Sequence, residues 1–551
     1  MKRKRLLTLS IFSGILMSLP YYPWLSGIIM MVAFLPLLFV EEFVYSTRDR
    51  NRPVVLFGYA WLVFLIWNAL TTWWIAKATL PGALIVIVVN SFLYALVFLL
   101  FHITKRNLGR QFGNFSLLVY WIGWEHLYLN AEISWPWLNL GNAFAKDVSL
   151  IQWYELTGAL GGTLWILAVN LMIFALLRHY IVYKHFSSQW ARIIFLLALI
   201  FVPVLLSVYI YNDYETKKDP YYMGIVQPSI DPYHEKFSGM SQERQMDILL
   251  ELSDSIADAQ MDYLIGPETA IHQDIQESKL REHPTLARLD SFVQQHPNLM
   301  VVLGMDSFRK YEAQEKPSPS ARRIGDSDSW IERYNSAIQI DTSDRWPIYH
   351  KSKLVVGVEK MPYPGVFGFL NDLIIDLGGT TGTRGSQDHR ETFAASGRSV
   401  KVAPVICYES VYGEYITDYV RNGARFIFVI TNDGWWGETI GYRQHMHFAR
   451  LRAIETRRSI VRAANTGISC FINQKGQVFK PTGWWERTAI KGTLHANEAM
   501  TIYVQYGDYI GRVADFMAVF AVLYLIAKVL VNRTRHAGLE RLRGGNQEGK
   551  G

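Results

Sequence analysis

Eight apolar stretches constrain the fold of this chain more than any other feature of its sequence. They lie at about 6–19, 24–40, 54–76, 82–103, 115–130, 163–183, 192–211 and 510–531. Most of them approach the roughly 20 residues that an α-helix needs to cross the hydrocarbon core of a bilayer. The sequence therefore predicts a membrane protein with eight helices, of which the first and the fifth are the shortest.

The basic residues alternate between the loops that join these stretches. They gather at the N-terminus, in three loops and in the C-terminal tail, namely at residues 2–5, 48–52, 105–110, 178–192 and 533–543. The opposing short loops carry only Lys77 and Lys146. By the positive-inside rule, both termini are expected in the cytoplasm. The net charge of +7 is then a sign of topology, and no nucleic-acid-binding pattern accompanies it.

The first stretch has one alternative reading, because a basic start followed by a short apolar core also fits a cleaved signal peptide. The residues that follow it, Leu19-Pro20-Tyr21-Tyr22, lack the small side chains that a cleavage site needs. We therefore expect the first stretch to stay in the protein as a membrane helix.

The chain divides into a transmembrane region at 1–211, a globular domain at 212–508, a last membrane helix at 509–532 and a basic tail at 533–551. The globular domain alternates predicted strands with predicted helices. Strands are expected at 223–227, 263–265, 299–304, 336–340, 400–406, 426–430 and 467–472. Helices are expected at 241–259 and 442–457 and in a stretch that ends at about residue 295, and residues 312–328 are expected to form a surface loop. Such alternation predicts an α/β domain in which helices cover a sheet, and the charge asymmetry places this domain outside the cytoplasm.

Three chemically complementary side chains follow predicted strands of this domain. Glu268 comes after Tyr263-Leu264-Ile265, Lys351 after Trp346-Pro347-Ile348-Tyr349-His350, and Cys407 after Val402-Ala403-Pro404-Val405-Ile406. A carboxylate, an amine and a thiol can together build and use a thiolate nucleophile. A lone cysteine on an apolar strand is more often a core residue, and that interpretation fits Cys470, which has no charged neighbours. We expect Cys407 to be the nucleophile and not to pair with Cys470 in a disulfide.

The order and context of these residues resemble the nitrilase superfamily, whose members have an αββα sandwich and a Glu-Lys-Cys triad. The downstream residues are similar as well, namely Asn432-Asp433-Gly434-Trp435-Trp436-Gly437, Gln444-His445, Arg452-Ala453, Glu455, Arg458, Arg462 and Asn465-Thr466-Gly467. A nitrilase-like domain inserted before the last membrane helix resembles the apolipoprotein N-acyltransferases of bacterial envelopes. Two segments depart from the family pattern, Gln227-Pro228-Ser229 and Val356-Gly357-Val358-Glu359.

This resemblance implies a mechanism and a location. Glu268 would be the general base, and Lys351 would lower the pKa of the Cys407 thiol and bind the oxyanion, together with the backbone N–H of Tyr408. Glu359 would orient Lys351 or relay the proton, while Tyr408 and Glu409 would support the nucleophile. The donor would be a membrane phospholipid and the acceptor a diacylated apolipoprotein, in the bacterial cytoplasmic (inner) membrane. We expect a monomer that needs neither metal nor cofactor, with His445-Met446-His447 on a helix packing surface.

Four aromatic residues are candidates for a lipid entrance. Phe367 and Phe369 lie in an apolar segment at 361–377 that is too short to span a membrane, so it forms either a core element or a loop that dips toward lipid. Trp435 and Trp436 would line an acyl-chain pocket or belong to an aromatic belt at the membrane surface.

Two other functions stay open at this level. The first is a membrane-bound amidase of the nitrilase type, in which water replaces the amine acceptor. The second is a lipid-binding or transport protein with an inert nitrilase-like domain, for which Glu125 and His126 in the fifth stretch would mark a pathway.

Overall fold

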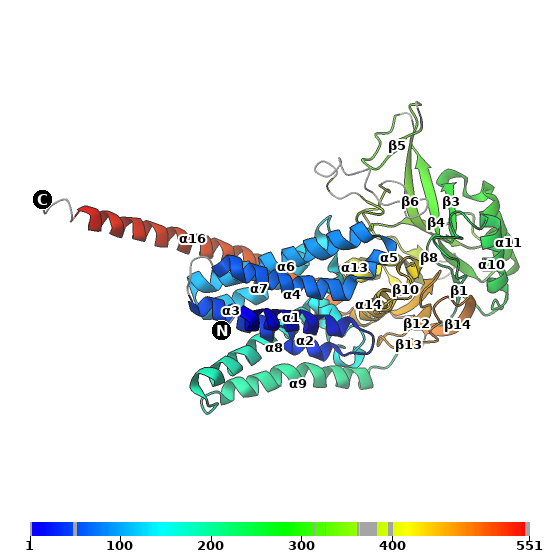
Figure 1. Ribbon diagram of the computed structural model, residues 1–551. Coiled ribbons are helices and arrows are strands. Elements are labelled where there is room, and N and C mark those ends of the chain that lie inside the picture. The colour runs from blue at the N-terminus through cyan, green and yellow to red at the C-terminus, as the bar shows by residue number, and fades with distance from the viewer. Residues whose placement is uncertain are drawn as a thin grey trace.

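The computed structural model describes residues 3–47, 52–216, 219–312, 314–325, 327–360, 363, 383–394 and 400–545. Its elements form two adjoining parts, a bundle of long helices and an α/β domain (Figure 1). The α/β domain is built by the chain between α9 (Trp190–Asp213) and α16 (Tyr509–Gly545). The domain is therefore inserted before the last long helix, as predicted.

The bundle contains the helices of the N-terminal part of the chain and α16. Besides α9 and α16, its helices are α1 (Arg3–Ser18), α2 (Met30–Ala33), α3 (Leu35–Thr47), α4 (Arg52–Thr72), α5 (Ile75–Ala78), α6 (Leu80–Leu108), α7 (Arg110–Asn130) and α8 (Tyr154–Tyr183). In the described part of the chain, six segments are long and apolar enough to cross a membrane. They are Gly27–Thr47, Pro53–Thr72, Leu80–Leu108, Tyr154–Tyr183, Trp190–Asp213 and Tyr509–Thr534.

Each of these six segments coincides with a predicted span. The two shortest predicted spans are helical as well, but α1 has only 16 residues and α7 carries the polar pair Glu125 and His126. The count of eight membrane helices stays a prediction for these two.

The outer helices present apolar side chains that no described residue covers. Only 6% of the most apolar stretch of α9 and 17% of that of α16 are buried, against 67% for α8. Leu205 and Phe516 are each 65% exposed. Apolar surface on this scale needs an apolar solvent, so these helices fit a protein that crosses the bilayer several times.

The α/β domain holds two sheets that pack face to face. The first has the order β14-β1-β2-β4-β6-β5, with β3 on β4 and β7 on β6, and the second has the order β13-β12-β11-β10-β9-β8. The strands of the first sheet are β1 (Pro220–Gln227), β2 (Tyr263–Ile265), β3 (Ile271–Gln276), β4 (Met300–Lys310), β5 (Arg322–Arg323), β6 (Trp330–Ile340), β7 (Ile348–His350) and β14 (Thr488–His495). Those of the second are β8 (Phe393–Ala394), β9 (Lys401–Ile406), β10 (Ala424–Thr431), β11 (Ser459–Ala464), β12 (Cys470–Ile472) and β13 (Val478–Phe479).

The alternation of side chains along β2 shows why the layers stack as they do. Tyr263 and Ile265 point into the core between the sheets, where the ring of Tyr263 lies 5.2 Å from that of Phe428. Leu264 points the other way, into a second core beneath two helices. A strand covered on both faces must be apolar at every position, as β2 is.

Helices close both sides of this double sheet. α10 (Gln242–Asp254) and α11 (Pro284–Gln295) cover the first sheet, while α13 (Gly413–Arg421) and α14 (Ile440–Thr456) lie between the second sheet and the membrane helices (Figure 1). A short helix, α15 (Ile502–Tyr506), leads into α16. The predicted αββα sandwich is confirmed.

Several element predictions were incomplete. The strand expected at 467–472 begins only at Cys470, because Gly467 has φ +140° and a Cβ there would lie 2.6 Å from Asp433 Oδ2. The helical stretch expected before residue 295 contains β3 as well as α11. The strands β11 and β14 were missed, and the loop expected at 312–328 carries the short strand β5.

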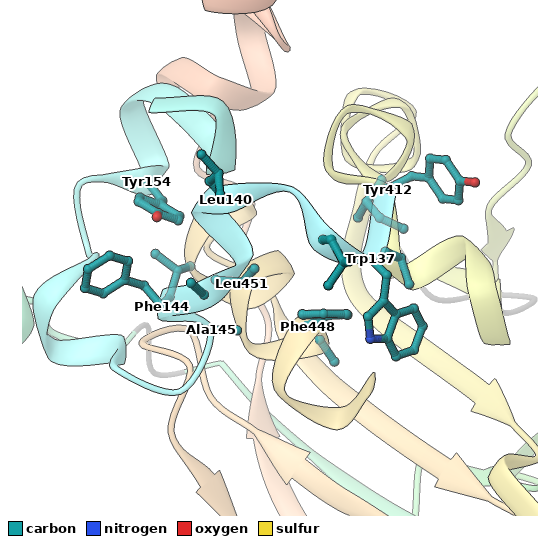
Figure 2. Close-up of a cluster of buried hydrophobic side chains, with 14 of the residues drawn as sticks. Trp137, Leu140, Phe144, Ala145, Tyr154, Tyr412, Phe448 and Leu451 are labelled. Carbon is teal, nitrogen blue, oxygen red and sulfur yellow. The ribbon is translucent and has the colours of Figure 1, made fainter. Parts of the chain in front are cut away.

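The membrane helices and the α/β domain are joined by buried contacts. The Nε1 atoms of Trp74 and Trp137 both donate to Gln444 Oε1 on α14, at 3.2 and 2.7 Å. Figure 2 shows the apolar part of this junction, which consists of Trp137, Leu140, Phe144, Phe448 and Leu451 among others. The connection between α7 and α8 therefore rests on α14, which brings the α/β domain against the membrane region.

Candidate active site

Three strand ends deliver the three predicted catalytic residues. Lys351 directly follows β7, Cys407 directly follows β9, and Glu268 follows β2 after Gly266 and Pro267. The backbone of Cys407 is left-handed, with φ +51°. This conformation is unfavourable for a side chain with a Cβ, and it marks a sharp turn from the strand into the short 3-10 helix Cys407–Val411.

The loop that carries Glu268 lies close against strand β4. A Cβ on Gly304 of β4 would lie 2.7 Å from the Cα of Glu268, and Gly304 N–H donates to Pro267 O at 2.9 Å. Thr269, the next residue, is left-handed with φ +47°. The absence of a side chain at Gly304 is therefore what lets Glu268 sit at this place.

Lys351 lies between two buried carboxylates. Its Nζ donates to Glu268 Oε1 at 3.0 Å and to Glu359 at 3.1 Å. Asn335 Nδ2 donates to both carboxylates, at 2.9 Å each. The exposed fractions of Lys351, Glu268 and Glu359 are only 2, 6 and 7%. Ion pairs this deeply buried hold their geometry because each charge depends on the others for compensation.

The electrostatics of the site fix the protonation of Lys351 and Glu359. Burial disfavours a charged lysine, but the carboxylates of Glu268 and Glu359 outweigh it and raise the pKa of Lys351 above its usual range. Burial raises the pKa of Glu359, but the Lys351 ammonium has the larger opposite effect, so the net pKa of this carboxyl is lowered. Lys351 is therefore a fixed cation at neutral pH.

The thiol of Cys407 is subject to opposing effects on its pKa. Burial and the charge of Glu268 raise its pKa, and the opposing effect of Lys351 is smaller than theirs. Lys351 lowers the thiol pKa, as predicted, but burial and Glu268 outweigh its contribution. The resting site thus holds a protonated thiol, which needs a base before it can attack.

The two residues after the nucleophile have different partners. Glu409 accepts from the backbone N–H of Ser352 at 2.7 Å and from that of Ile406 at 2.8 Å, so it ties the lysine loop to the cysteine turn. Tyr408 donates to Ser134 O at 2.9 Å, and its ring stacks on Trp135 at 5.9 Å. Tyr408 therefore faces the connection between α7 and α8, next to the membrane region.

The two tryptophans of the downstream motif point in different directions. Trp436 packs on Trp74, at the end of α4, with ring centroids 4.7 Å apart. Trp435 stacks on Phe237 at 5.9 Å and meets the ring of Tyr233 edge-on at 5.2 Å. Phe367 and Phe369, with most of the apolar segment at 361–377, lie outside the described residues.

The sequence interpretation missed a second buried lysine near the triad. Lys236 is 2% exposed, and its Nζ donates to the backbone O of Glu268 at 3.1 Å. Burial lowers its pKa to about 8, against the opposing charges of Glu268 and Asp306. In the sequence Lys236 stands in an ordinary polar loop, and only the folded chain brings it beneath Glu268.

This burial predicts a pH dependence of stability. The pKa of Lys236 is about 8 in the folded chain, against roughly 10.4 in the unfolded chain. At a pH between these two values the unfolded state binds more protons than the folded state, so stability increases as the pH rises. The free energy of unfolding of the wild type should therefore rise between pH 8 and 10 relative to that of Lys236→Met, by about 1 kcal/mol or more. Thermal unfolding in detergent measures it, with the exposed Lys491→Met as a control that should follow the wild type. If the stability of the wild type and that of Lys236→Met change in parallel with pH, the pKa of Lys236 is not lowered by burial.

His445 lies on a packing surface of α14, as predicted, with its ring 5.8 Å from that of Trp137 and 5.4 Å from that of Trp436. It is fully buried, and its Nε2 lies 3.2 Å from the backbone O of Cys407. His447, two residues further along α14, lines a cavity of about 420 Å³ together with Tyr442, Met446 and Trp484. The paired His-x-His pattern thus places one histidine behind the nucleophile and the other outside the site.

One group of side chains has the geometry to hold a metal ion, among the residues that the structure describes. His126, Glu414 and Asp508 have ligand atoms within 4.8 Å of one another, at the junction of α7, α13 and α16. Each already has a protein partner, since Arg512 pairs with Glu414 at 2.7 Å and Tyr503 donates to Asp508 at 2.8 Å. His126 Nδ1 faces Asp515 at 2.6 Å. None of the three belongs to the triad.

Comparison with known proteins places the chain in a family. The profile of the Carbon-nitrogen hydrolase family matches residues 223–502, which cover the α/β domain. The chain therefore belongs to the carbon-nitrogen hydrolase family. The profile of the Apolipoprotein N-acyltransferase N-terminal domain matches residues 13–172, in the membrane region. Together with the full-length relatives below, this makes the chain a member of the apolipoprotein N-acyltransferases.

These relatives extend over nearly the whole chain. The apolipoprotein N-acyltransferase of Chlorobaculum tepidum is 27% identical over 532 residues, covering 93% of this chain and 97% of the relative. Those of Geobacter metallireducens and Thermotoga maritima are each 26% identical and cover 91% and 99% of this chain, and 91% and 96% of their own lengths. Among solved structures, an amidase of Nesterenkonia from the nitrilase superfamily is 13% identical, with a TM-score of 0.35, over 54% of this chain and 99% of its own.

Proposed function

We propose that this protein transfers an acyl chain from a membrane phospholipid to the N-terminal amine of the S-diacylglyceryl-cysteine of apolipoproteins. The acyl chain would pass through a thioester on Cys407. The observation that carries the proposal is the buried cation Lys351, which lies between Glu268 and Glu359 and acts electrostatically on a buried thiol. This arrangement fits a base-assisted attack on an ester carbonyl better than any structural role.

The first half of the reaction forms the thioester. Glu268 takes the proton of the Cys407 thiol, and Sγ attacks the ester carbonyl of the phospholipid. Lys351 and the backbone N–H of Tyr408 stabilise the oxyanion. The C–O bond then breaks, and Glu268 returns the proton to the leaving alkoxide, which departs as a lysophospholipid.

The second half forms the amide. The lipoprotein amine attacks the thioester carbonyl, Glu268 takes the amine proton, and the C–S bond breaks as Cys407 regains its proton. An amide is more stable than a thioester, so the step requires no further source of energy. The positive-inside pattern of the loops supports a domain outside the cytoplasm, where the reaction would have to proceed without an activated acyl donor such as acyl-CoA.

The surroundings of Cys407 support lipid substrates. Tyr408 contacts the α7–α8 connection at Ser134 and Trp135, and Trp436 packs on Trp74 of the membrane region. An aromatic surface thus runs from the cysteine turn to the membrane helices, and we assign it to the acyl chain. Trp435, Phe367 and Phe369 remain sequence predictions for the lipid entrance.

A product balance tests the proposal. Purified protein in detergent would be incubated with phospholipid and a synthetic diacylated lipopeptide, and both products quantified by mass spectrometry. We expect one triacylated lipopeptide for each lysophospholipid, with little free fatty acid. Free fatty acid in place of the triacylated peptide would identify a hydrolase, and unchanged phospholipid would leave only a lipid-binding role.

A further inference from the structure

A buried charged network lies behind the nucleophile and takes no part in the mechanism above. It consists of His445 on α14, Asp433 after β10 and Arg462 on β11, all with no exposed surface. His445 Nδ1 lies 3.0 Å from Asp433 Oδ1, and Arg462 donates to Asp433 Oδ2 at 2.7 Å. The guanidinium charge of Arg462, with the contact of His445, outweighs burial and holds the pKa of Asp433 below its usual range. Three such groups are costly to bury, so the network must hold a geometry that apolar residues would not.

The partners of His445 determine which ring nitrogen carries a proton. Its Nε2 faces the backbone O of Cys407 at 3.2 Å and Ser410 Oγ at 3.0 Å. A carbonyl oxygen only accepts, and the Ser410 hydroxyl donates its own proton to the same carbonyl at 2.7 Å. Nε2 must therefore be protonated and donate toward Cys407. On the other side of the ring, Nδ1 lies 3.0 Å from both Arg462 Nη2 and Asp433 Oδ1, and this pair holds the imidazole in that orientation.

The direction of this hydrogen bond matters because the peptide is planar. In a trans peptide, the C=O of Cys407 and the N–H of Tyr408 point in opposite directions. The carbonyl points toward α14, so the N–H points away from it, toward the first sheet, from which Glu268 and Lys351 come. A hydrogen bond to the carbonyl also polarises the peptide and strengthens its N–H as a donor.

We infer that His445 is a positioning residue for the oxyanion site. Through its hydrogen bond to the Cys407 carbonyl, and with Ser410, it fixes the Cys407–Tyr408 peptide so that the Tyr408 N–H faces the acyl carbonyl. Asp433 and Arg462 hold His445 in place. The inference rests on the proposed acyl chemistry of Cys407, but not on the identity of the donor or acceptor.

The left-handed turn at Cys407 explains why such a support is needed. With φ at +51°, this peptide is not held by regular strand or helix geometry on both sides. A small rotation would turn the N–H away from the oxyanion, and a displacement of about 1 Å can cost roughly 10²-fold in rate. Alkylation of the thiol by iodoacetamide forms no oxyanion, so it does not depend on this N–H.

Two reactions of Cys407 therefore test the inference. The first is acylation by a 4-nitrophenyl fatty acyl ester, followed as the burst of 4-nitrophenolate, and the second is alkylation by iodoacetamide. In His445→Leu we expect the burst rate to fall about 10²-fold, with alkylation within about threefold of the wild type. His445→Gln keeps an N–H at the position of Nε2 and should recover about tenfold. His447→Leu, the same substitution two residues away on α14, should match the wild type in both reactions.

The outcomes separate this inference from the proposed function. A burst within threefold of the wild type in His445→Leu would overturn the positioning role. So would an equal loss of burst and alkylation in a variant that unfolds at the wild-type temperature, since that places the defect in the thiol. Failure of the wild type to acylate a lipopeptide would overturn the proposed function alone, because the activated ester still reports the oxyanion site.

Discussion

Replacing Cys407 by alanine is expected to abolish acyl transfer while leaving the protein folded. The thiol is the only group in the site that can form the covalent intermediate, so its removal should lower the rate by about 10⁴-fold or more. The side chain is small and 8% exposed, so the loss of one sulfur atom should change the unfolding temperature by only a few degrees. The rate would be followed as conversion of a diacylated to a triacylated lipopeptide.

The chain offers a matched control for this variant. Cys470 on β12 is the other free cysteine, and it is buried without any exposed surface. Cys470→Ala creates a similar small cavity in the same sheet and should keep nearly the full rate of transfer. Residual transfer in Cys407→Ala above about a tenth of the wild-type rate would rule out the thioester. A transport protein with an inert domain would be indifferent to both substitutions.

Glu268→Gln is expected to have the second largest effect, because it removes the base and little else. The amide keeps an oxygen that can accept from Lys351 and from Asn335, and it loses only the acceptor of the Asn432 N–H, so the site should stay assembled. The thiol has a raised pKa and cannot supply the nucleophile unaided. Loss of a general base typically costs about 10²–10⁴-fold, and we expect the transfer rate to fall within that range.

Glu277→Gln is the appropriate comparison for this prediction. Glu277 pairs with His350, the residue before Lys351, at 2.7 Å, but it does not contact the triad. This variant should transfer within about threefold of the wild type. Equal losses in Glu277→Gln and Glu268→Gln would mean that the rate reports the packing of this region and not a proton transfer. Thermal unfolding of both variants checks that neither has lost its fold.

The positions of Glu268, Lys351 and Cys407 at strand ends were predictable because each residue follows a short apolar strand. Cys407 and Lys351 directly follow runs whose β-branched and aromatic residues end abruptly, and Glu268 follows one after Gly-Pro. The ends of such strands meet at one edge of a sandwich. The pairing of Glu359 with Lys351 also agrees with the sequence interpretation, although the residues between them depart from the family pattern.

The supporting residues were not predictable, for physical reasons that differ from case to case. Lys236 binds a backbone oxygen, which no pattern of side chains reveals. Asn335 lies within β6 and bridges two carboxylates that come from other segments. Arg462 interrupts the apolar run of β11, which concealed that strand, and its charge is compensated only after α14 and the turn at Asp433 have packed around it.

The membrane region shows a similar limit. The apolar stretches predicted all eight helices, including α1 and α7, but only six segments in the described part of the chain are long and apolar enough to cross a membrane. The net rise in the pKa of the Cys407 thiol is another result of packing. A sequence shows the charges of Lys351 and Glu268, but it does not show how deeply the thiol is buried between them.

The most direct test of this account is mass spectrometry of the Cys407 peptide after the purified protein has met phospholipid without an acceptor. We predict an acyl adduct on Cys407 that hydroxylamine removes and that a diacylated lipopeptide discharges, with none on Cys470. A folded protein that carries no adduct on Cys407, or an adduct that the lipopeptide leaves in place, would contradict the account.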